Sequence, residues 1–519
     1  MDDTTEHDCG HEPSLAKGEG LADDGAAQST TIPVETGPSV AGKVVSGFLW
    51  RFAERISEQL VQFVVSIVLA RLIAPAEFGT ISLVLVFTQV LQVFVDSGVA
   101  TALIQKKDAD SIDFSSVFYF NLVWCSLVYA VAFFGAPAVA AFYGKPELTA
   151  ITRVLALTVI ISGPRNVQQA YVSRTMQFRR FFWATLSGTV ISGVVGIAMA
   201  QMHYGVWALV MQQVLNVGVA TVVLWFTVHW RPTLEFSFER LWGLISFGWK
   251  LLAAGLIDVI YNNIRQLLIG KLYTETDLAF FNRGQQLPML VVINVNTSLD
   301  SVLLPVMSRE QDDLGRVREM CRKSIAVNTF VIAPLMMGMA FCAEPLISLV
   351  FTDKWLPTVP YLQLFCIAYV FSPLQTITVD AVKALGESGL YLRLEVVKKA
   401  VGVVLLLATM NISVMALAYS LVASYLVTQI INMWASRRIL EYRYSDQLRD
   451  ILPSIALAVA MGCAVRPLAL LSLPTIVILA MQFFLGAGIY LGGSALLGLD
   501  AFGHMKQLAL SLLSKVRSA

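Results

Sequence analysis

Long apolar runs recur along the chain between residues 46 and 498 and alternate with short polar segments. A helix needs about 20 apolar residues to cross a hydrocarbon core about 30 Å thick. We therefore predict an all-α polytopic membrane protein with about fourteen transmembrane helices, at 46–70, 79–104, 115–142, 148–170, 181–202, 206–228, 242–270, 278–306, 323–350, 358–383, 393–410, 412–436, 451–470 and 474–498.

The Lys and Arg residues are distributed unequally between alternate loops. With the N-terminus placed in the cytoplasm, the cytoplasmic segments carry 23 Lys and Arg residues and the outer loops carry five. Cytoplasmic loops of membrane proteins carry such an excess, and a missed or additional helix would reverse the alternation beyond the error. The charges therefore favour fourteen helices with both termini in the cytoplasm.

An internal repeat relates the two halves of the chain. At a shift of 200 residues, Leu60–Gln62 aligns with Ile260–Asn262 and Ala70–Leu72 aligns with Gly270–Leu272. An even number of helices per copy gives the copies the same orientation, an arrangement found in transporters with a central site between the repeats. We predict an N-lobe of helices 1–6, a C-lobe of helices 7–12 and two additional helices, at 43–230, 241–440 and 450–498.

The two ends of the chain differ from the apolar middle. Residues 1–42 contain nine acids and one lysine and have no signal-peptide pattern, which predicts a disordered cytoplasmic tail. Residues 500–519 place apolar side chains on one helical stripe beside basic residues, which is typical of an interfacial amphipathic helix.

The composition excludes several classes of protein. Hydrophobic residues make up 56% of the chain and charged residues 14%, whereas a soluble domain has roughly 25% charged residues. A net charge of +1 argues against nucleic-acid binding through bulk charge. The six cysteines show no CxxC spacing, and no Walker A motif is present. We expect neither an enzyme nor a bound cofactor or metal.

Polar residues inside the predicted helices mark a candidate site. An ionisable side chain at the bilayer centre costs about 2.5–3.5 kcal/mol on insertion scales, so it is expected to face a cavity. The candidates for substrate binding in a central cavity are Arg51, Arg55, Gln62, Arg165, Lys250, Asn262, Arg265, Arg283 and Gln286. The candidates for coupling to Na⁺ or H⁺ are Glu58, Asp96, Asp258 and Asp300.

A structural interpretation competes with the functional one for some of these residues. Arg51 and Arg55 have acids three residues further on, at ion-pair spacing, and lie near the inner end of their helix. For Glu54 we favour an ion pair, and for the two arginines both interpretations stay open. Asp258 is equally suited to pairing with a cation. Arg265 and Arg283 have no acid three or four residues away, which favours a role in the cavity.

Several segments carry a family resemblance. The stretch LARLIAPAEFG at Leu69–Gly79 and the segments Asp96–Val99, Ser246–Lys250, Phe281–Leu287 and Leu304–Arg309 resemble those of polysaccharide flippases of the multidrug/oligosaccharidyl-lipid/polysaccharide exporter superfamily. The resemblance is greatest to the lipopolysaccharide, colanic-acid and teichuronic-acid exporter branch, from about residue 45 to 440. Relatives commonly have Tyr-Asn-Arg-Ala where this chain has FNRG, so the arginine is retained and the tyrosine hydroxyl is not.

The resemblance implies translocation of an undecaprenyl-diphosphate-linked oligosaccharide across the bacterial cytoplasmic membrane, from the inner to the outer leaflet, by alternating access. Its partners would be the lipid-linked sugar, membrane lipids and polymerases or glycosyltransferases of the same pathway. Two alternatives remain. A cation-coupled multidrug exporter of the same superfamily would favour a cavity of acids and aromatics. A membrane glycosyltransferase or polymerase would need a larger outer loop with catalytic carboxylates.

Overall fold

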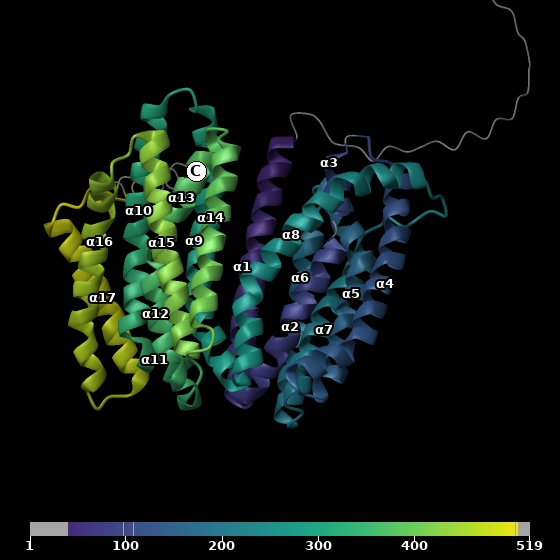
Figure 1. The fold of residues 1–519 in the computed structure, drawn as a ribbon, viewed down its shortest axis with the longest axis horizontal. Helices are drawn as coiled ribbons and strands as arrows, with labels where there is room; N and C mark the ends of the chain where they lie inside the picture. Colours follow the sequence, from purple (N-terminus) through teal and green to yellow (C-terminus); the bar gives the residue numbers. More distant parts are fainter. Residues whose placement is uncertain (1–39, 97, 107, 504, 507–519) are drawn as a thin grey trace, which may run out of the picture.

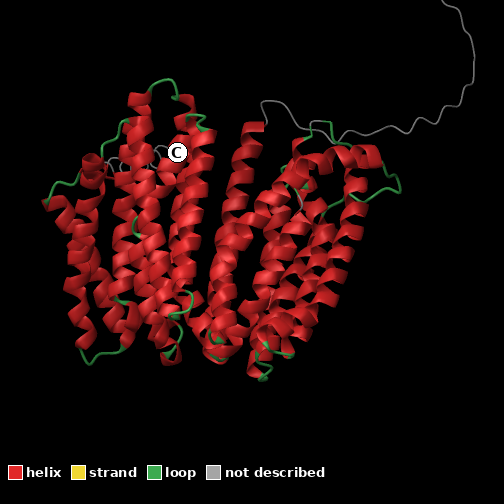
Figure 2. Ribbon diagram, in the orientation of Figure 1, coloured by secondary structure: helices red, strands yellow, loops and turns green. Residues whose placement is uncertain are grey.

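A computed structural model describes residues 40–96, 98–106, 108–503 and 505–506 of the chain. Within these residues the fold is entirely helical, with no strand (Figure 2). The predicted acidic tail lies almost wholly outside the described residues, as does most of the predicted amphipathic helix at 500–519.

The helices form two groups of steeply inclined rods, with α1 and α8 standing between them (Figure 1). The first half of the chain forms α1 (Val40–Leu72), α2 (Pro75–Asp96), α3 (Val99–Gln105), α4 (Ser111–Tyr143), α5 (Glu147–Arg174), α6 (Phe178–Gln201) and α7 (Val206–Thr227). The second half forms α8 (Phe238–Leu272), α9 (Glu275–Arg309), α10 (Leu314–Phe341), α11 (Ala343–Val350), η1 (Asp353–Thr358), α12 (Val359–Tyr369), α13 (Ser372–Ala384), α14 (Ser388–Thr409), α15 (Val414–Leu440), α16 (Tyr444–Val465), η2 (Arg466–Leu470) and α17 (Thr475–Leu496).

Helix packing joins the two halves through a few elements. Helix α1 packs mainly on α6, whereas α8 packs on α2, α3, α4 and α9. Helix α2 also packs on α9, so the start of the second half is interleaved with the first. Helices α16 and α17 pack on one another, and α16 covers α10 at the outer flank of the second group (Figure 1).

Equivalent helices in the two halves keep the spacing of the sequence repeat. Helix α1 ends at Leu72 and α8 ends at Leu272, and in each case a two-residue turn leads into the next helix, at Pro75 or Glu275. The shift of 200 residues inferred from the sequence therefore also relates these helix boundaries.

Each of the fourteen predicted runs overlaps a helix, and three of the runs are divided between two α-helices. The run 79–104 breaks at Gly98, whose φ of 69° lies in the left-handed region. The run 323–350 breaks at Cys342, between α10 and α11. The run 358–383 breaks between α12 and α13, where Pro373 opens the second helix. Proline is favoured in a first helical turn because it lacks an N–H that would otherwise stay unpaired.

Among the described residues, eleven helices are long and apolar enough to cross a membrane, or twelve if the two parts of α8, bent by 41°, form one span. The chain is therefore a multi-pass helical membrane protein, while the count of fourteen stays a prediction. Helices α1 and α14 are not among the eleven because both are rich in charged residues.

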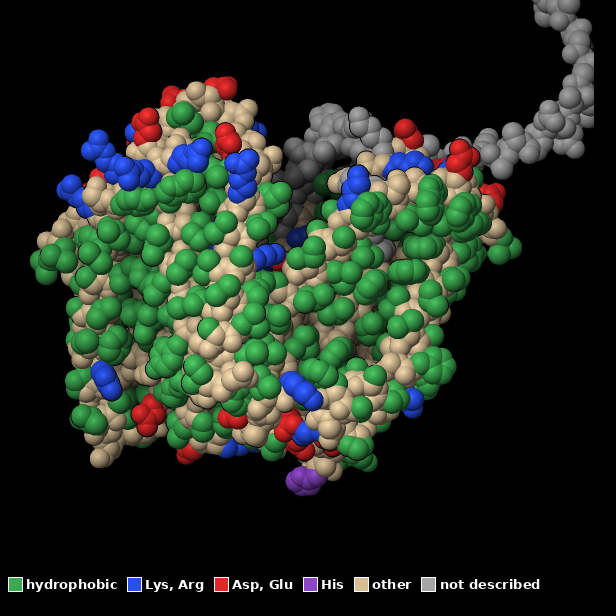
Figure 3. Space-filling model, viewed as in Figure 1, with side chains coloured by type: hydrophobic (Ala, Val, Ile, Leu, Met, Phe, Trp, Pro, Cys, Tyr) green, Lys and Arg blue, Asp and Glu red, His purple; other side chains and the backbone are tan. Residues whose placement is uncertain are grey.

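The two ends of the helix bundle differ in charge. On the face shown in Figure 3, most Lys and Arg side chains gather at the end where the loops 309–314, 385–388 and 440–444 lie. We call this the basic end. The turns 72–75 and 272–275 lie at the opposite end, which we call the closed end for the contacts described below.

Candidate substrate cavity

A cavity of roughly 550 Å³ lies between helices of both halves. Its walls come from α1, α2, α7, α8 and α9. The polar side chains that line it are Gln59, Gln62, Ser66, Ser82, Gln89, Gln212, Gln213, Asn216, Gln266, Asn282, Arg283, Gln285 and Gln286. Apolar side chains, among them Phe63, Phe78 and Leu209, complete the wall.

Amides dominate this lining. Eight glutamines and two asparagines line the cavity, and Arg283 is the one charged residue in a lining that consists of described residues. Their spacing explains the concentration, because Gln59, Gln62 and Ser66 are three and four residues apart in α1 and therefore share one helix face. An amide both donates and accepts hydrogen bonds, so the wall matches a ligand with many hydroxyl groups.

Arg283 is held at one end of the cavity and is only 7% exposed. Its Nη1 donates to Ser66 Oγ at 2.6 Å and to Gln286 Oε1 at 2.5 Å. The guanidinium also lies 4.5 Å from the ring centre of Phe78 and 5.5 Å from that of Trp355. The Ser66 hydroxyl, the Gln286 amide and the two aromatic rings thus orient the guanidinium. It has no carboxylate partner among the described residues, so its charge is available to an anionic group.

The two halves are fastened together at the closed end, beside Arg283. Trp355 is fully buried, and its indole N–H donates to the carbonyl of Ala70 at 2.8 Å. Lys354 Nζ donates to the carbonyls of Arg71 and Ile73, each at 2.8 Å. In return, Arg71 Nε donates to the carbonyl of Val350 at 3.0 Å. These contacts close that end of the cavity.

The basic end is open by comparison. Figure 3 shows a hollow between the two groups of helices at this end. Between α1 and α9, Arg55 reaches Thr297 Oγ1 only at 3.5 Å, the limit of a hydrogen bond. The cavity is therefore closed toward one end of the bundle and approached from the other.

Three of the nine predicted substrate-binding residues line the cavity: Gln62, Arg283 and Gln286. Arg51 instead pairs with Glu54 at 3.0 Å and stacks on Phe181 of α6, with its guanidinium 4.1 Å from the ring centre. The favoured ion pair of Glu54 is confirmed, and Arg51 is a packing residue of the α1–α6 contact. Arg55 contacts Thr297, as above, while Glu58 accepts from Gln62 at 3.2 Å.

Arg165 lies behind the cavity with two of the coupling candidates. On α5 it interacts electrostatically with Glu58 and Asp96. Asp96 also accepts from Asn166 at 3.2 Å. Since Gln62 both lines the cavity and bonds Glu58, this charged cluster is connected to the cavity through one side chain.

Three further predicted residues lie along the exposed side of α8. Asp258 pairs with Lys399 of α14 at 3.2 Å and accepts from Asn262 at 3.0 Å. The alternative that Asp258 pairs with a nearby cation is thus confirmed. Lys250 is exposed on the same helix. The side chain of Asp300 lies outside the described part of the chain, and Arg265 is considered separately below.

Most of the cavity lining was missed by a search for ionisable residues. Gln212, Gln213 and Asn216 on α7 and Gln285 on α9 carry no charge, so the cost of burying a charge did not single them out. The sequence nevertheless contains a pattern that identifies such residues, because amides recur three to four residues apart within otherwise apolar runs.

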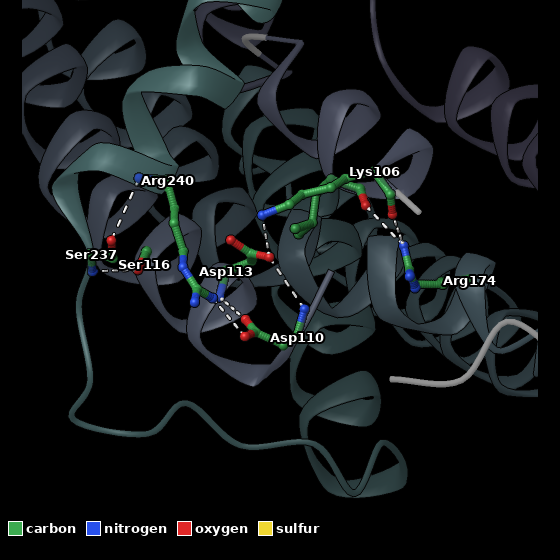
Figure 4. A network of polar contacts seen from close by, with 8 residues as sticks. Lys106, Asp110, Asp113, Ser116, Arg174, Ser237 and Arg240 are labelled. Atoms are coloured by element: carbon green, nitrogen blue, oxygen red, sulfur yellow. Dashed lines mark hydrogen bonds and ion pairs between the residues drawn. The ribbon is translucent and has the colours of Figure 1, made fainter. Parts of the chain in front are cut away.

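A polar network at the basic end fixes the start of α8 against α4 (Figure 4). Arg240 pairs with Asp110 at 2.6 Å, and Lys106 pairs with Asp113 at 2.6 Å. Burial raises the pKa of Asp110, but the hydrogen bonds and charges of Arg240, the Asp113 amide and Lys106 outweigh it, so that the pKa is lowered overall. The network ties the first turn of the second half to the first half.

The helices and the cavity between the two halves define a polytopic helical membrane protein with the architecture of a transporter. The solved structure of the lipid II flippase MurJ in an inward closed conformation has the same fold, with a TM-score of 0.70 at 11% identity over 87% of this chain and 98% of that one.

The sequence assigns the family. The model of the polysaccharide biosynthesis protein family matches residues 68–360, and the chain belongs to this family. The teichuronic acid biosynthesis protein TuaB of Bacillus subtilis is 24% identical over 82% of this chain and 89% of its own length. The succinoglycan biosynthesis transport protein ExoT of Rhizobium meliloti is 24% identical over 67% of this chain and 71% of its own. These matches confirm the resemblance drawn from the motifs.

Proposed function

We propose that this protein is a flippase that carries a lipid-linked oligosaccharide from the cytoplasmic to the outer leaflet of a bacterial cytoplasmic membrane. The observation that carries the proposal is the amide-lined cavity with Arg283 at its closed end. The names of the similar proteins, which concern polysaccharide synthesis, transport and lipid II flipping, support it.

The cavity chemistry suits a sugar headgroup. Each sugar hydroxyl left unpaired in hydrocarbon costs several kcal/mol, so a carrier must replace its water with other partners. The ten amides of the lining supply donors and acceptors in pairs. The lipid tail can meanwhile stay in the bilayer beside the cleft.

The charge of the cavity favours an anionic ligand over a cationic one. Arg283 is the one charged lining residue, and an arginine fork bonds phosphate or carboxylate oxygens at two points. A cavity built for cationic drugs would need carboxylates, and the lining has none. This composition favours the flippase over the drug exporter of the same superfamily.

Alternating access would then consist of opening the two ends of the helix bundle in turn. The basic end faces the cytoplasm in this proposal, since positive charge marks the cytoplasmic side, and the topology predicted from the sequence assigns both termini to that side. The lipid-linked sugar enters from this side, and the halves release the contacts of Trp355 and Lys354 to open the opposite side. A doubly charged anion leaving an inside-negative cell gains about 4.6 kcal/mol per 100 mV, because each charge contributes about 2.3. Coupling to Na⁺ or H⁺ through Glu58 or Asp96 would add to this drive.

Mass spectrometry of lipid extracts tests the proposal directly. Cells that lack the protein should accumulate a polyprenyl-diphosphate oligosaccharide with complete repeat units and lose a surface polymer. Restoring the wild-type chain should reverse both changes. If the lipids are unchanged and sensitivity to cationic drugs rises instead, the drug exporter is the better assignment. If incomplete repeat units accumulate, the glycosyltransferase alternative is favoured.

A further inference from the structure

Arg265 is buried on α8 with part of its hydrogen-bonding capacity unused. The residue is 7% exposed, and its Nε and Nη2 atoms are both buried without a hydrogen-bond partner. These two nitrogens share one edge of the planar guanidinium, so their N–H bonds point in parallel. That edge is the fork with which arginine binds an anion at two points.

The immediate neighbours of Arg265 are aromatic. Its electrostatic neighbours are Tyr261, Tyr425 and Tyr369, of which Tyr261 also hydrogen-bonds it. Tyr369 and Tyr425 pack edge to face, with ring centres 5.2 Å apart. Within the described residues no ion pair neutralises the guanidinium, in contrast to Arg322, which Asp450 holds at 2.9 Å.

Burying the Arg265 guanidinium without a partner for its charge costs free energy of folding. Removing one member of a buried ion pair costs about 3–5 kcal/mol, because it leaves an uncompensated charge in a medium of low polarity. A buried polar group without a protein partner is commonly satisfied by a bound ion or water. The neighbouring turn of α15 adds a second such group, since Gln429 is one helical turn beyond Tyr425 and both of its amide atoms are buried and unpaired.

We propose that Arg265 and its three tyrosines form a binding site for a small inorganic anion, a halide or phosphate. The Nε–Nη2 edge of Arg265 donates two parallel hydrogen bonds to the anion, and the hydroxyl of Tyr425 can add a third. The aromatic enclosure by α8, α12 and α15 restricts the ligand to a small ion. This site is separate from the cavity, whose lining does not include Arg265.

The anion site lies directly behind the cavity wall. Gln285 lines the cavity, and its Nε2 donates to the hydroxyl of Tyr369 at 2.9 Å. Gln266, the residue after Arg265, also lines the cavity. A bound anion thus fastens the outer part of α8 to α12 and α15 and supports the side chains that form the wall. It does so whatever ligand the cavity carries.

The test compares anions on the purified full-length protein. Thermal unfolding is followed in sodium gluconate while chloride, bromide or inorganic phosphate is added in separate series at constant ionic strength. The wild-type Tm should rise and saturate with at least one of these small anions, since a ligand that binds only the folded state stabilises it. The series that saturates identifies whether a halide or phosphate is the ligand. Crystals grown in bromide or phosphate should place the corresponding ion at the Nε–Nη2 edge.

Two variants control this experiment. Arg265→Gln removes the charge, so its Tm should no longer respond to the anion. Arg322→Gln removes an arginine that has its own carboxylate, so the anion response should persist. A wild-type Tm that is insensitive to all three anions, or a response that Arg265→Gln retains, would overturn the proposal. Loss of flipping without any anion response would not support it.

Discussion

The same two halves of the molecule meet in opposite ways at the two ends of the bundle. At the closed end, Lys354 and Trp355 bond the last carbonyls of α1, and Arg71 bonds the last carbonyls of α11. Toward the basic end, the one contact between α1 and α9 described above is that of Arg55 with Thr297 at 3.5 Å, and Figure 3 shows a hollow between the two groups of helices there.

The two ends of the bundle differ in the chemical groups through which the halves contact one another. The final carbonyls of a helix have no partner within the helix and carry partial negative charge, so cations are stabilised beside them. At the closed end, each half therefore caps a helix of the other half. These capping contacts can be broken readily, because water can replace the lysine and the arginine as hydrogen-bond donors to the helix carbonyls of both halves. The buried indole of Trp355 is the part that water replaces poorly, and we expect it to dominate the strength of the closure.

The largest loss of stability should come from removing the Trp355 side chain at the closed end. Trp355→Ala removes a fully buried ring and its bond to Ala70, and replacement of a buried Trp by Ala costs about 3–5 kcal/mol. Thermal unfolding should show a much lower Tm than wild type. Trp355→Phe keeps most of the ring and loses only the N–H, so it should retain most of the stability. Equal losses in both variants would mean that the hydrogen bond, not the ring, holds this end.

Arg283 connects the closed end to the cavity, and its charge should be needed for transport. Arg283→Gln should slow flipping by about tenfold or more, since a hydrogen bond to a charged group is worth about 1.5–3 kcal/mol and 1.4 kcal/mol is a factor of ten. The measurement is the amount of accumulated lipid-linked oligosaccharide in complemented cells. Arg51→Gln is the matched control, because Arg51 contacts Glu54 and Phe181 outside the cavity. Equal export by wild type and Arg283→Gln would contradict the role of this arginine.

Removing the cationic caps should loosen the closed end with less loss of stability. Lys354→Met deletes the bonds to the carbonyls of Arg71 and Ile73 but keeps an unbranched side chain. A cysteine introduced at Ser82, inside the cavity, should then react faster with a membrane-impermeant thiol reagent added on that side. The parent with Ser82→Cys alone supplies the baseline rate. An unchanged rate would show that Trp355 is sufficient to keep this end shut.

The smallest effect concerns the network that ties α8 to α4 at the basic end. Because the pKa of Asp110 is lowered in the folded protein, its contribution to stability is complete above the ordinary value and is lost as pH falls through the folded one. The free energy of unfolding should therefore decrease on acidification below about pH 4. Asp110→Asn should flatten this part of the pH profile. A variant that keeps the full slope would assign the acid sensitivity to other carboxylates.

The helices and their repeat were predictable, and the cavity was only partly so. Apolar length located the helices because the bilayer imposes that length, and the shift of 200 residues survives in the boundaries at Leu72 and Leu272. Charge singled out Arg283, which lines the cavity, because an arginine in an apolar helix needs a polar environment. For Arg51, where a cavity role and an ion pair were both open, the structure shows the pair with Glu54 within the first half.

Two aspects of the site required three-dimensional contacts. Hydropathy cannot tell a glutamine that faces a cavity from one that is packed, so the amide wall appears only when α1, α7 and α9 are brought together. The closing contacts at Trp355 join residues 285 positions apart, and no local pattern marks such a partner.

The interruption of α2–α3 and the bend of α8 meet at one point. Gly98, with its positive φ, lies against the backbone of Gly248, so that an added Cβ would stand 2.6 Å from the Gly248 oxygen. The 41° bend of α8 is next to that glycine. The two irregularities therefore meet in one close contact between the backbone at Gly98 and the bent start of α8. A single methyl group at position 98 would therefore have no room unless α8 moved away from α3, so the bare backbone of Gly98 is what lets the two chain halves approach this closely.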